Sequence, residues 1–444
     1  MKLIKSISGI RGIFGETLNQ TTVEHYAKAF SIIQPRGDIL LARDTRPHGK
    51  ELYQSISKEL TYCGRNVINC GIIPTPTAQF IIKNKKIAGG IVITASHNPI
   101  EWNGLKFLDS DGCFLNANKM NKLLSIIPER ITIDRGNIIE FKNAHLNHID
   151  NVLNLQCFQI DKIKQKEFKV VVDTVNGAAY KALPELLEKL NCDIIKINCE
   201  NNGIFSRGTE PIPSHLKGLS KAVIENNADI GLATDPDADR LAIVDNLGNP
   251  IGEESTLVLA VESYLKFYRD SQTIVTNLST SMGVDVIAKK YNSTVERTSV
   301  GEINVVEKMK KINSNIGGEG NGGVILKESH LGRDSLVATV LVLNHLAHSN
   351  SSLHEILNNL AQFTMIKDKI TLENEVNFNE IKSVFSDEKN VSFLEGDGLK
   401  IIWIDKWVHI RKSNTEPIIR IISEANNYNQ AKKLIDNIKN SISY

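Results

Sequence analysis

The stretch that decides the fold is Gly89-Gly-Ile-Val-Ile-Thr-Ala-Ser-His-Asn-Pro99. Its β-branched run indicates a strand, and Ser-His-Asn-Pro predicts that the strand ends in a tight turn that exposes the hydroxyl of Ser96. Open α/β sheets place their chemistry at such strand ends. The stretch therefore predicts an α/β domain with a functional serine at the edge of its sheet. The alternative for the hexapeptide alone is a strand followed by an ordinary Asn-Pro turn.

Short β-branched runs and amphipathic stretches continue to alternate along the chain. Strands are expected at 38–42, 66–70, 90–93, 169–173, 193–197, 228–232, 273–276, 294–297 and 323–326, with helices near 21–33 and 50–62 in the first part. This alternation is typical of βαβ units, and it returns three times. The sequence therefore predicts three α/β domains in series, each with a mixed sheet.

The pattern changes from about Lys389 onward. Closely spaced strands at 401–404, 407–410 and 418–421 follow a Gly-Asp-Gly turn, and one helix is expected near 428–442. This order predicts a smaller C-terminal α+β domain with an antiparallel sheet. The expected domains are residues 1–149, 150–249, 250–364 and 365–444.

Composition excludes several classes of partner. The 444 residues include 52 Lys and Arg against 51 Asp and Glu, so no global field indicates binding to nucleic acid or an anionic membrane. The longest apolar run, Leu336–Leu343, is far below the roughly 18 residues of a membrane span, and the N-terminus lacks a signal-peptide core. The six cysteines form no C-x-x-C pair. We therefore expect a cytoplasmic protein with reduced thiols.

A second motif, Asp235-Pro-Asp-Ala-Asp-Arg240, follows a predicted strand directly. In an extended segment, carboxylates at alternate positions project to one side, so three oxygen ligands converge on one cation. An EF-hand is excluded, because Arg240 stands where that loop needs Gly and Asn246 where it needs Glu. A solvated acidic turn is the alternative, but three unpaired carboxylates this close repel one another.

A third motif, Gly317-Gly-Glu-Gly-Asn-Gly-Gly323, contains a formal G-x-G-x-x-G. A dinucleotide fingerprint needs a helix after it, whereas here a strand continues. A glycine-dense loop suits close approach to a polyhydroxyl ligand, with Glu319 accepting from hydroxyls and Asn321 donating and accepting. The alternative is a simple hairpin turn.

A fourth motif lies between Arg411 and Arg420. These two guanidiniums bracket the turn Ser413-Asn414-Thr415, and together they offer bidentate forks, hydroxyls and amides for a phosphate. Solvated basic residues beside a turn are the alternative.

The four motifs together indicate phosphoryl chemistry. The chain has no G-x-S-x-G, and Ser96 and His97 in an extended chain would point to opposite faces, which argues against a hydrolase nucleophile. A nucleophilic oxygen, a carboxylate cation site and an arginine-rich anion site are instead what phosphoryl transfer needs.

In this order and spacing, the motifs resemble those of the α-D-phosphohexomutase family over essentially the whole chain. The resemblance implies a heart-shaped, four-domain enzyme in which Ser96 is phosphorylated and completes a Mg²⁺ site with Asp235, Asp237 and Asp239. It implies that phosphoserine gives its phosphate to a hexose monophosphate, that a 1,6-bisphosphate forms and primes the enzyme, and that this intermediate returns its other phosphate.

The resemblance also implies roles for single residues. Arg11 and Arg240 match the family's active-site arginines, and Lys106 in Asn103-Gly-Leu-Lys106 matches its general base. A lysine base needs its pKa lowered from about 10.4 by burial or neighbouring arginines. The alternatives are that Lys106 is a phosphate-binding cation and that His97, with an ordinary pKa near 6.5, is the acid or base.

Substrate choice depends on Gly301-Glu302, which resembles the sugar-selecting loop of phosphoglucosamine mutases; phosphomannomutase/phosphoglucomutases tend to carry Gly-His there. An anionic Glu302 suits the ammonium at C2 of glucosamine phosphate, although acidity at a helix N-terminus is the alternative explanation. Many bacterial relatives have Ser and His where this chain has Asn321 and Gly323, which removes a possible proton donor. The chain looks most like Bacteroidetes-type phosphoglucosamine mutases.

These observations lead to one expectation with three alternatives. We expect interconversion of glucosamine 6-phosphate and glucosamine 1-phosphate, by a monomer or weak homodimer that binds small hexose phosphates. A phosphomannomutase/phosphoglucomutase with the same mechanism is the nearest alternative. A metal-dependent phosphatase would release inorganic phosphate, and a silent sugar-phosphate sensor would carry no phosphate on Ser96.

Overall fold

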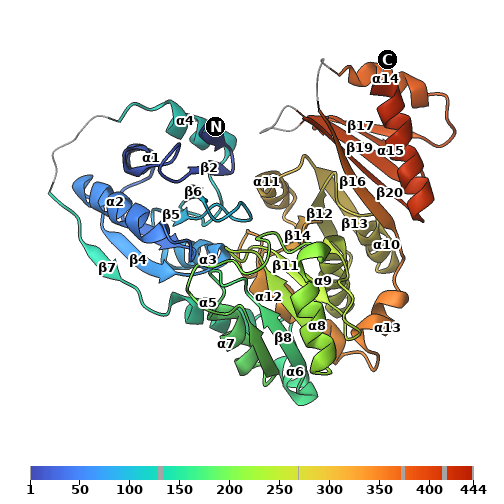
Figure 1. The fold of residues 1–444 in the computed structure, drawn as a ribbon, viewed down its shortest axis with the longest axis horizontal. Helices are drawn as coiled ribbons and strands as arrows, with labels where there is room; N and C mark the ends of the chain where they lie inside the picture. The colour runs from blue at the N-terminus through green and yellow to red at the C-terminus, as the bar shows by residue number, and fades with distance from the viewer. Residues whose placement is uncertain (1, 129–133, 269, 372–375, 413–417, 443–444) are drawn as a thin grey trace.

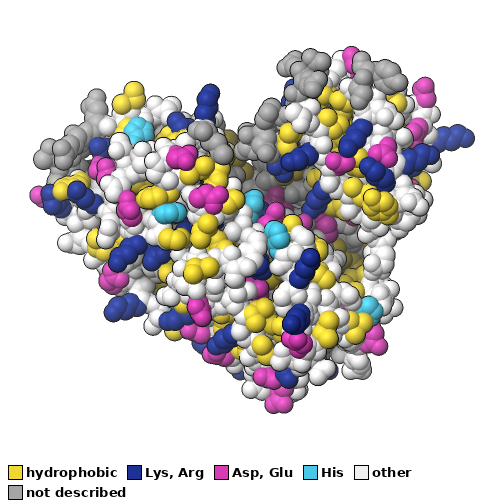
Figure 2. Space-filling model, in the orientation of Figure 1, with side chains coloured by type: hydrophobic (Ala, Val, Ile, Leu, Met, Phe, Trp, Pro, Cys, Tyr) yellow, Lys and Arg dark blue, Asp and Glu magenta, His cyan; other side chains and the backbone are white. Residues whose placement is uncertain are grey.

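The computed structural model describes residues 2–128, 134–268, 270–371, 376–412 and 418–442. It contains three mixed α/β domains and a C-terminal domain with an antiparallel sheet, so the predicted fold class is confirmed. The first domain, blue in Figure 1, and the fourth, red, form the two upper lobes of a heart. Figure 2 shows the notch between these lobes. Among the described helices, none is long and apolar enough to cross a bilayer.

The first domain is built on a seven-stranded mixed sheet of order β1-β2-β6-β5-β3-β4-β7. Its elements are β1 (Ile4–Ser6), β2 (Gly9–Ile13), α1 (Gln20–Ile33), β3 (Ile39–Arg43), α2 (Gly49–Tyr62), β4 (Val67–Ile72), α3 (Thr75–Lys85), β5 (Gly89–Ile93), β6 (Trp102–Leu108), α4 (Ala117–Ser125), β7 (Ile138–Glu140) and α5 (Ala144–Leu153). Strand β3 shows why both faces are covered: Ile39 and Leu41 pack toward α1 and α2, whereas Leu40 and Ala42 pack toward α3. The predicted strand β5 therefore lies inside a two-sided core.

The second domain has a four-stranded sheet of order β11-β10-β8-β9, in which only β11 is antiparallel to its neighbour. Its elements are α6 (Ile160–Lys166), β8 (Lys169–Asp173), α7 (Ala182–Lys189), β9 (Asp193–Ile197), the 3₁₀ turn η1 (Pro213–His215), α8 (Lys217–Glu225), β10 (Ile230–Thr234) and β11 (Leu241–Val244). The predicted strand at 228–232 is β10, which begins two residues later. The aspartate motif is the loop that joins β10 to β11.

The third domain has a four-stranded sheet of order β13-β12-β14-β15. Its elements are α9 (Glu253–Phe267), β12 (Thr273–Asn277), α10 (Gly283–Lys290), β13 (Thr294–Thr298), α11 (Glu302–Ile312), β14 (Ile316–Glu319), β15 (Gly323–Leu326), α12 (Ser335–Ala347) and α13 (Leu353–Asn358). Every residue of α12 is buried, because it packs against α9 and β15 on one side and α5 and α6 on the other. The most apolar run of the sequence is therefore a central core helix.

The fourth domain has a five-stranded antiparallel sheet of order β16-β20-β19-β18-β17. Its elements are β16 (Thr364–Thr371), α14 (Phe378–Phe385), β17 (Ser392–Glu395), β18 (Leu399–Ile402), β19 (Trp407–Lys412), β20 (Ile418–Ala425) and α15 (Tyr428–Ile442). Helices α14 and α15 contribute apolar residues to the core over this sheet.

The fourth domain docks on the third mainly through hydrogen bonds to main-chain groups. These bonds join Lys400 Nζ to Leu278 O at 2.5 Å, Val300 N to Asp397 Oδ2 at 2.8 Å and Met282 N to Glu424 Oε2 at 2.8 Å, and Ser279 Oγ lies 2.8 Å from His409 Nδ1. They lie beside the notch, so they fix the distance between the sheet of the fourth domain and the strand ends of the third.

Candidate active site

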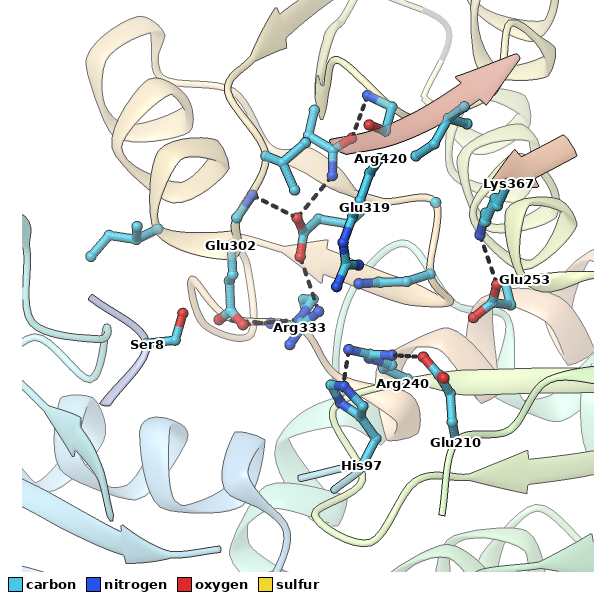
Figure 3. A pocket seen from close by; sticks show the side chains of 18 of the residues that line it. Ser8, His97, Glu210, Arg240, Glu253, Glu302, Glu319, Arg333, Lys367 and Arg420 are labelled. Carbon is cyan, nitrogen blue, oxygen red and sulfur yellow. Dashed lines mark hydrogen bonds and ion pairs between the residues drawn. The ribbon is translucent and has the colours of Figure 1, made fainter. Parts of the chain in front are cut away.

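A cavity of about 510 Å³ lies where all four domains meet (Figure 3). Each domain contributes polar or charged side chains to its wall. They include Arg11, His97 and Lys106 from the first domain, Glu210 and Arg240 from the second, Glu302, Glu319, Asn321 and Arg333 from the third, and Lys367, Arg411 and Arg420 from the fourth. The structure thus brings residues of all four sequence motifs to one place.

Ser96 lies three residues beyond the end of β5. Its backbone adopts the left-handed conformation, with φ +49°, and its N–H donates to Thr94 Oγ1 at 2.9 Å. Its hydroxyl donates to Asp235 Oδ2 at 3.1 Å, and the side chain of the residue is buried. The prediction of an exposed hydroxyl was wrong, because the aspartate loop of the second domain covers it.

Arg46, which the sequence analysis did not single out, holds the serine loop in place. Its guanidinium is fully buried, pairs with Asp44 at 3.1 Å and donates to four carbonyl oxygens of the loop. The acceptors are those of Ser96, Asn98, Pro99 and Trp102. The signal available in the sequence was Asp44-Thr-Arg46, directly after a predicted strand.

The carboxylates of Asp235, Asp237 and Asp239 converge, with oxygens within 4.8 Å of one another, and all three residues are buried. The predicted extended geometry was wrong: the segment is a turn in which Ala238 has φ +58°. Burial and the two neighbouring carboxylates raise the pKa of Asp235 well above its usual value. Oδ1 of Asp237 and of Asp239 has no hydrogen-bond partner among the described residues. Unpaired, buried hard oxygens fit a divalent cation.

Lys106 extends from β6 to the same carboxylates. Its Nζ lies 2.5 Å from Asp237 Oδ2 and 3.1 Å from Asp239 Oδ2. Burial alone lowers the pKa of Lys106, but the two carboxylates outweigh it, and the pKa lies above its ordinary value. The expectation of a lowered pKa was therefore wrong for this arrangement, in which Lys106 is a protonated ion-pair partner.

His97 faces the cavity beside Ser96 (Figure 3). Its Nδ1 lies 3.5 Å from Ser96 Oγ and accepts from Arg240 Nη2 at 3.3 Å. The prediction of opposite faces was wrong, because the left-handed turn at Ser96 redirects the chain. Burial, then Arg240 and Arg11, lower the pKa of His97 to about 2. The ring is therefore neutral and cannot serve as an acid near neutral pH.

Arg11 and Arg240 lie in the wall around this serine. Arg11, on β2, donates to Asn98 Oδ1 at 3.0 Å, and Arg240 donates to Glu210 Oε1 at 3.2 Å. Glu210, which was not predicted, thereby orients Arg240 toward His97 (Figure 3). Two guanidiniums next to one hydroxyl provide positive charge where a phosphoryl group would lie.

Arg333 belongs to none of the four sequence motifs and was not predicted. It comes from the segment between β15 and α12 and pairs with Glu302 Oε2 at 2.9 Å, Glu319 Oε2 at 2.9 Å and Asp239 Oδ2 at 2.6 Å. The available signal was the charged pair Arg333-Asp334 directly before the most apolar run, although Asp334 alone is explained as the N-cap of α12.

Glu302 and Glu319 lie on either side of Arg333 (Figure 3). Glu302 begins α11, and burial raises its pKa to about 7 against the opposing charge of Arg333. Glu319 ends β14 and accepts from Asn277 Nδ2 at 2.8 Å and from Gly301 N at 3.0 Å. The glycine-rich motif is a β14–β15 hairpin, and it also places Glu319 and Asn321 in the cavity wall.

The fourth domain contributes Arg411 and Arg420, which lie opposite each other on the neighbouring strands β19 and β20. Both line the cavity. The predicted Ser413, Asn414 and Thr415 lie outside the described residues. Lys367, which was not predicted, also reaches the wall and pairs with Glu253 at 2.9 Å. The cavity wall therefore carries many cations, and three of its residues, His97, Lys106 and Arg240, contact Ser96 or the aspartate cluster. This arrangement suits a phosphorylated ligand.

Models of the four domains of one protein family match the chain in order. They are described as phosphoglucomutase/phosphomannomutase alpha/beta/alpha domains I, II and III, at residues 2–132, 144–248 and 253–363, and the C-terminal domain, at 367–441. Together they cover nearly the whole chain.

Full-length relatives agree with these matches. The chain is 33% identical to a phosphoglucomutase/phosphomannomutase of Thermococcus kodakarensis over 96% of both chains, and 33% identical to a phosphoglucosamine/phosphogalactosamine mutase of Sulfurisphaera tokodaii over 97% of both. A Burkholderia thailandensis crystal structure of a phosphoglucomutase/phosphomannomutase family protein shares the fold, with a TM-score of 0.85 at 22% identity, over 99% of this chain and 97% of the other. The chain therefore belongs to the phosphoglucomutase/phosphomannomutase family, the α-D-phosphohexomutases, and is a phosphohexomutase isomerase.

Proposed function

We propose that this phosphohexomutase is a phosphoglucosamine mutase that interconverts glucosamine 6-phosphate and glucosamine 1-phosphate. One observation carries the mechanism: the Ser96 hydroxyl lies 3.1 Å from a carboxylate of the aspartate cluster, next to His97, which lines a cavity to which all four domains contribute. Phosphoryl transfer requires a nucleophilic oxygen, a site for a metal cation and positively charged side chains close to one another.

In the proposed reaction, Ser96 carries the phosphate at the start. The bond between Ser96 Oγ and phosphorus breaks while a hydroxyl oxygen of the sugar phosphate forms the new bond, and the proton of that hydroxyl passes through the general base to Ser96 Oγ. The resulting 1,6-bisphosphate turns around and returns its other phosphate to Ser96, which regenerates the enzyme. A hexose 1,6-bisphosphate supplied from outside would prime an unphosphorylated Ser96 in the same way.

Asp235, Asp237 and Asp239 would hold Mg²⁺, which matches their hard, buried and partly unpaired oxygens. When bound, the ion supplies positive charge for the phosphoryl oxygens. Arg11 and Arg240 stabilise the same charge from the cavity side.

Lys106 is the proposed general base. Asp237 and Asp239 hold the pKa of Lys106 above its ordinary value and so keep it protonated. If these carboxylates bound Mg²⁺ instead, their attraction for the ammonium would weaken, and the pKa of Lys106 would fall toward that of a base. His97 is the weaker candidate, because its neutral ring already accepts a hydrogen bond from Arg240.

Sugar recognition is assigned to Glu302, Glu319 and Asn321, and recognition of the non-transferred phosphate to Arg411 and Arg420. Two glutamates in the sugar region support glucosamine, whose ammonium they would attract. The names of full-length relatives include phosphoglucosamine/phosphogalactosamine mutase and phosphoglucosamine mutase, and membership of a Bacteroidetes-type subgroup stays a prediction.

A phosphoglucomutase/phosphomannomutase is the second candidate. The observation that favours it is the 2.9 Å ion pair between Glu302 and Arg333, which already neutralises the charge that Glu302 would offer to an ammonium. The mechanism is unchanged in this case.

Several expectations stay predictions: the domain boundaries 1–149, 150–249, 250–364 and 365–444, a cytoplasmic location, and a monomer or weak homodimer. Closure of the fourth domain over the sugar phosphate is also expected, since an open site would lose phosphate to water.

The test is ³¹P NMR of Mg²⁺-supplemented enzyme with catalytic bisphosphate, given glucosamine 6-phosphate, glucose 6-phosphate or mannose 6-phosphate. Fastest equilibration of the glucosamine pair is expected. Faster conversion of glucose or mannose phosphate would establish the second candidate instead. Release of free inorganic phosphate from all three would contradict a mutase.

Ser96→Ala tests the nucleophile in the same assay. We expect turnover to fall at least about 1,000-fold, since the group that accepts the phosphate is removed, while sugar phosphate binding persists. Ser57→Ala is the control, because Ser57 lies on α2 and bonds only within its helix. Normal turnover of Ser96→Ala would refute the assigned role.

A further inference from the structure

We infer that Arg333 positions the sugar-binding carboxylates of Glu302 and Glu319, and that glycine at position 323 is what gives this arginine its place in the cavity. The inference rests on the proposed function, because it treats these glutamates as ligands of the sugar. It assigns to this chain a positioning residue outside its four sequence motifs.

The guanidinium of Arg333 connects three segments of the chain: the start of α11, the glycine-rich hairpin and the aspartate loop. Its Nε donates to Glu302 at 2.9 Å, its Nη1 to Glu319 at 2.9 Å and its Nη2 to Asp239 at 2.6 Å. Its backbone N–H donates to the other oxygen of Glu302 at 3.3 Å. One rigid planar fork therefore fixes the sugar-selecting helix and the glycine-rich hairpin relative to the aspartate loop.

Three carboxylates share this one cation. Glu302, Glu319 and Asp239 are each 7% exposed or less, so their mutual repulsion is poorly screened by water. Without Arg333, the two glutamates would have to separate or take up protons. Either change would alter the hydrogen bonds they offer to sugar hydroxyls.

Gly323 is needed for space and not for its backbone conformation. A Cβ at this position would lie 2.2 Å from Cδ and 2.9 Å from Cγ of Arg333. Gly323 is absent from the glycines with positive φ, so any residue could adopt its backbone. Any side chain larger than glycine here could not coexist with Arg333 in its present place. Gly323 and Arg333 are therefore two parts of one arrangement.

The backbone at Arg333 is anchored by its neighbour Asp334 and by helix α12. The next residue, Asp334, caps α12 by accepting from the N–H groups of Leu336 and Val337, and its second oxygen contacts His148 at 2.9 Å. Because α12 is buried along its whole length, the position of Arg333 is set by the core of the molecule. This anchoring suits a residue that acts by holding others in place.

The experiment is a double-mutant cycle of Gly323→Ala, Arg333→Ala and both together. Gly323→Ala keeps every charged group but forces Arg333 out of its place, so it tests the inference even if Arg333→Ala does not fold. We expect each single variant to raise KM for the preferred sugar phosphate by about tenfold or more, with a smaller fall in kcat. The double variant should be little worse than Arg333→Ala, since the added methyl group no longer meets Cγ and Cδ of Arg333 and its remaining near neighbour is Asn321 Oδ1 at 3.1 Å.

Two controls separate positioning from general damage. Gly218→Ala places the same methyl group on α8, where nothing lies within 4 Å, and should leave KM unchanged. Arg333→Lys keeps a charge that cannot bridge three partners, and should give an intermediate KM. Sugar phosphate affinity, measured by calorimetry in a Ser96→Ala background, should fall in parallel with the rise in KM.

Wild-type KM for Gly323→Ala, or fully additive effects in the double variant, would overturn the inference. The proposed function fails separately, if wild-type enzyme interconverts no hexose phosphate in the NMR assay. Active wild-type enzyme with unaffected variants would remove only the role of Arg333.

Discussion

At the scale of single residues, the three aspartates differ in how far positively charged side chains stabilise their ionised carboxylates. Lys106 pairs with Asp237 and Asp239, and Arg333 pairs with Asp239. Among the residues that the structure describes, Asp235 accepts only from the Ser96 hydroxyl and from the backbone N–H of Arg240, and its pKa is raised well above its usual value. Asp235 is therefore the carboxylate whose ionisation depends most on a bound cation.

Asp235→Asn should abolish the stabilisation of the protein by Mg²⁺ at small cost to the metal-free protein. An amide resembles the protonated carboxyl that Asp235 favours without a cation, whereas Asp239→Asn leaves both Lys106 and Arg333 short of a partner and should be the more destabilising change. For the wild type, a Mg²⁺ concentration 100 times the Kd should add about 2.7 kcal/mol to the free energy of unfolding.

Thermal unfolding in EDTA and in MgCl₂ measures both effects. A wild-type midpoint that ignores Mg²⁺ would contradict the assigned cation site. So would an Asp235→Asn variant that responds to Mg²⁺ as the wild type does.

Residue types and spacing were sufficient to predict the serine, the aspartates and the outer arginines, because their chemistry is local. Arg333 and Arg46 could not be found in this way. The partners of Arg333 lie 14 to 94 positions away in the sequence, and those of Arg46 lie up to 56 positions away. Only the fold brings these residues together. The pKa expectations for Lys106 and His97 were wrong for the same reason, since burial and charges distant in the sequence decide these pKa values.

At the scale of elements, α12 is a helix that the hydrophobic pattern of the sequence does not predict. A helix that is buried on all sides has no polar face, so its sequence shows an apolar run without helical periodicity. The strands with alternating or β-branched patterns, such as β3, β8 and β19, were predicted within a few residues. Strand β6, which carries Lys106, was not predicted, because its polar and glycine residues hide the strand pattern.

Leu341→Ala in the middle of α12 should reduce the free energy of unfolding by about 2–5 kcal/mol. The side chain is fully buried among helices of the second and third domains, so the deletion leaves a cavity. Leu247→Ala, at a position that is 53% exposed, is the matched control and should change stability by less than about 0.5 kcal/mol. Urea unfolding followed by circular dichroism measures the difference, and equal losses for both variants would show that α12 is not the central core element.

At the scale of the whole molecule, the docking of the fourth domain includes a titratable group. His409 is buried, its Nδ1 lies 2.8 Å from Ser279 Oγ, and its Nε2 lies 2.7 Å from Asp397 O. Burial lowers its pKa to about 4. The native protein therefore keeps the ring neutral at pH values where the unfolded chain, with a pKa near 6.5, is protonated.

Stability should consequently decline as the pH falls from 6.5 toward 4, because the unfolded state binds the additional proton. A pKa difference of this size corresponds to a loss on the order of 3 kcal/mol from this one group. His409→Gln should flatten this part of the profile of stability against pH, whereas His25→Gln, at an exposed position on α1, should change it much less. Urea unfolding at pH 7.5, 6 and 5 measures the slope, and identical slopes for wild type and His409→Gln would contradict the assignment.

The contact between the third and fourth domains has a consequence for comparing sequences. Three of its hydrogen bonds end on main-chain groups of Leu278, Met282 and Val300, and these groups are present whatever side chain stands there. Substitutions at these positions need no matching change in Lys400, Glu424 or Asp397. Coupled variation in an alignment of relatives would therefore under-report this interface, and only proline at 282 or 300, which lacks the donated N–H, would reveal it by its absence.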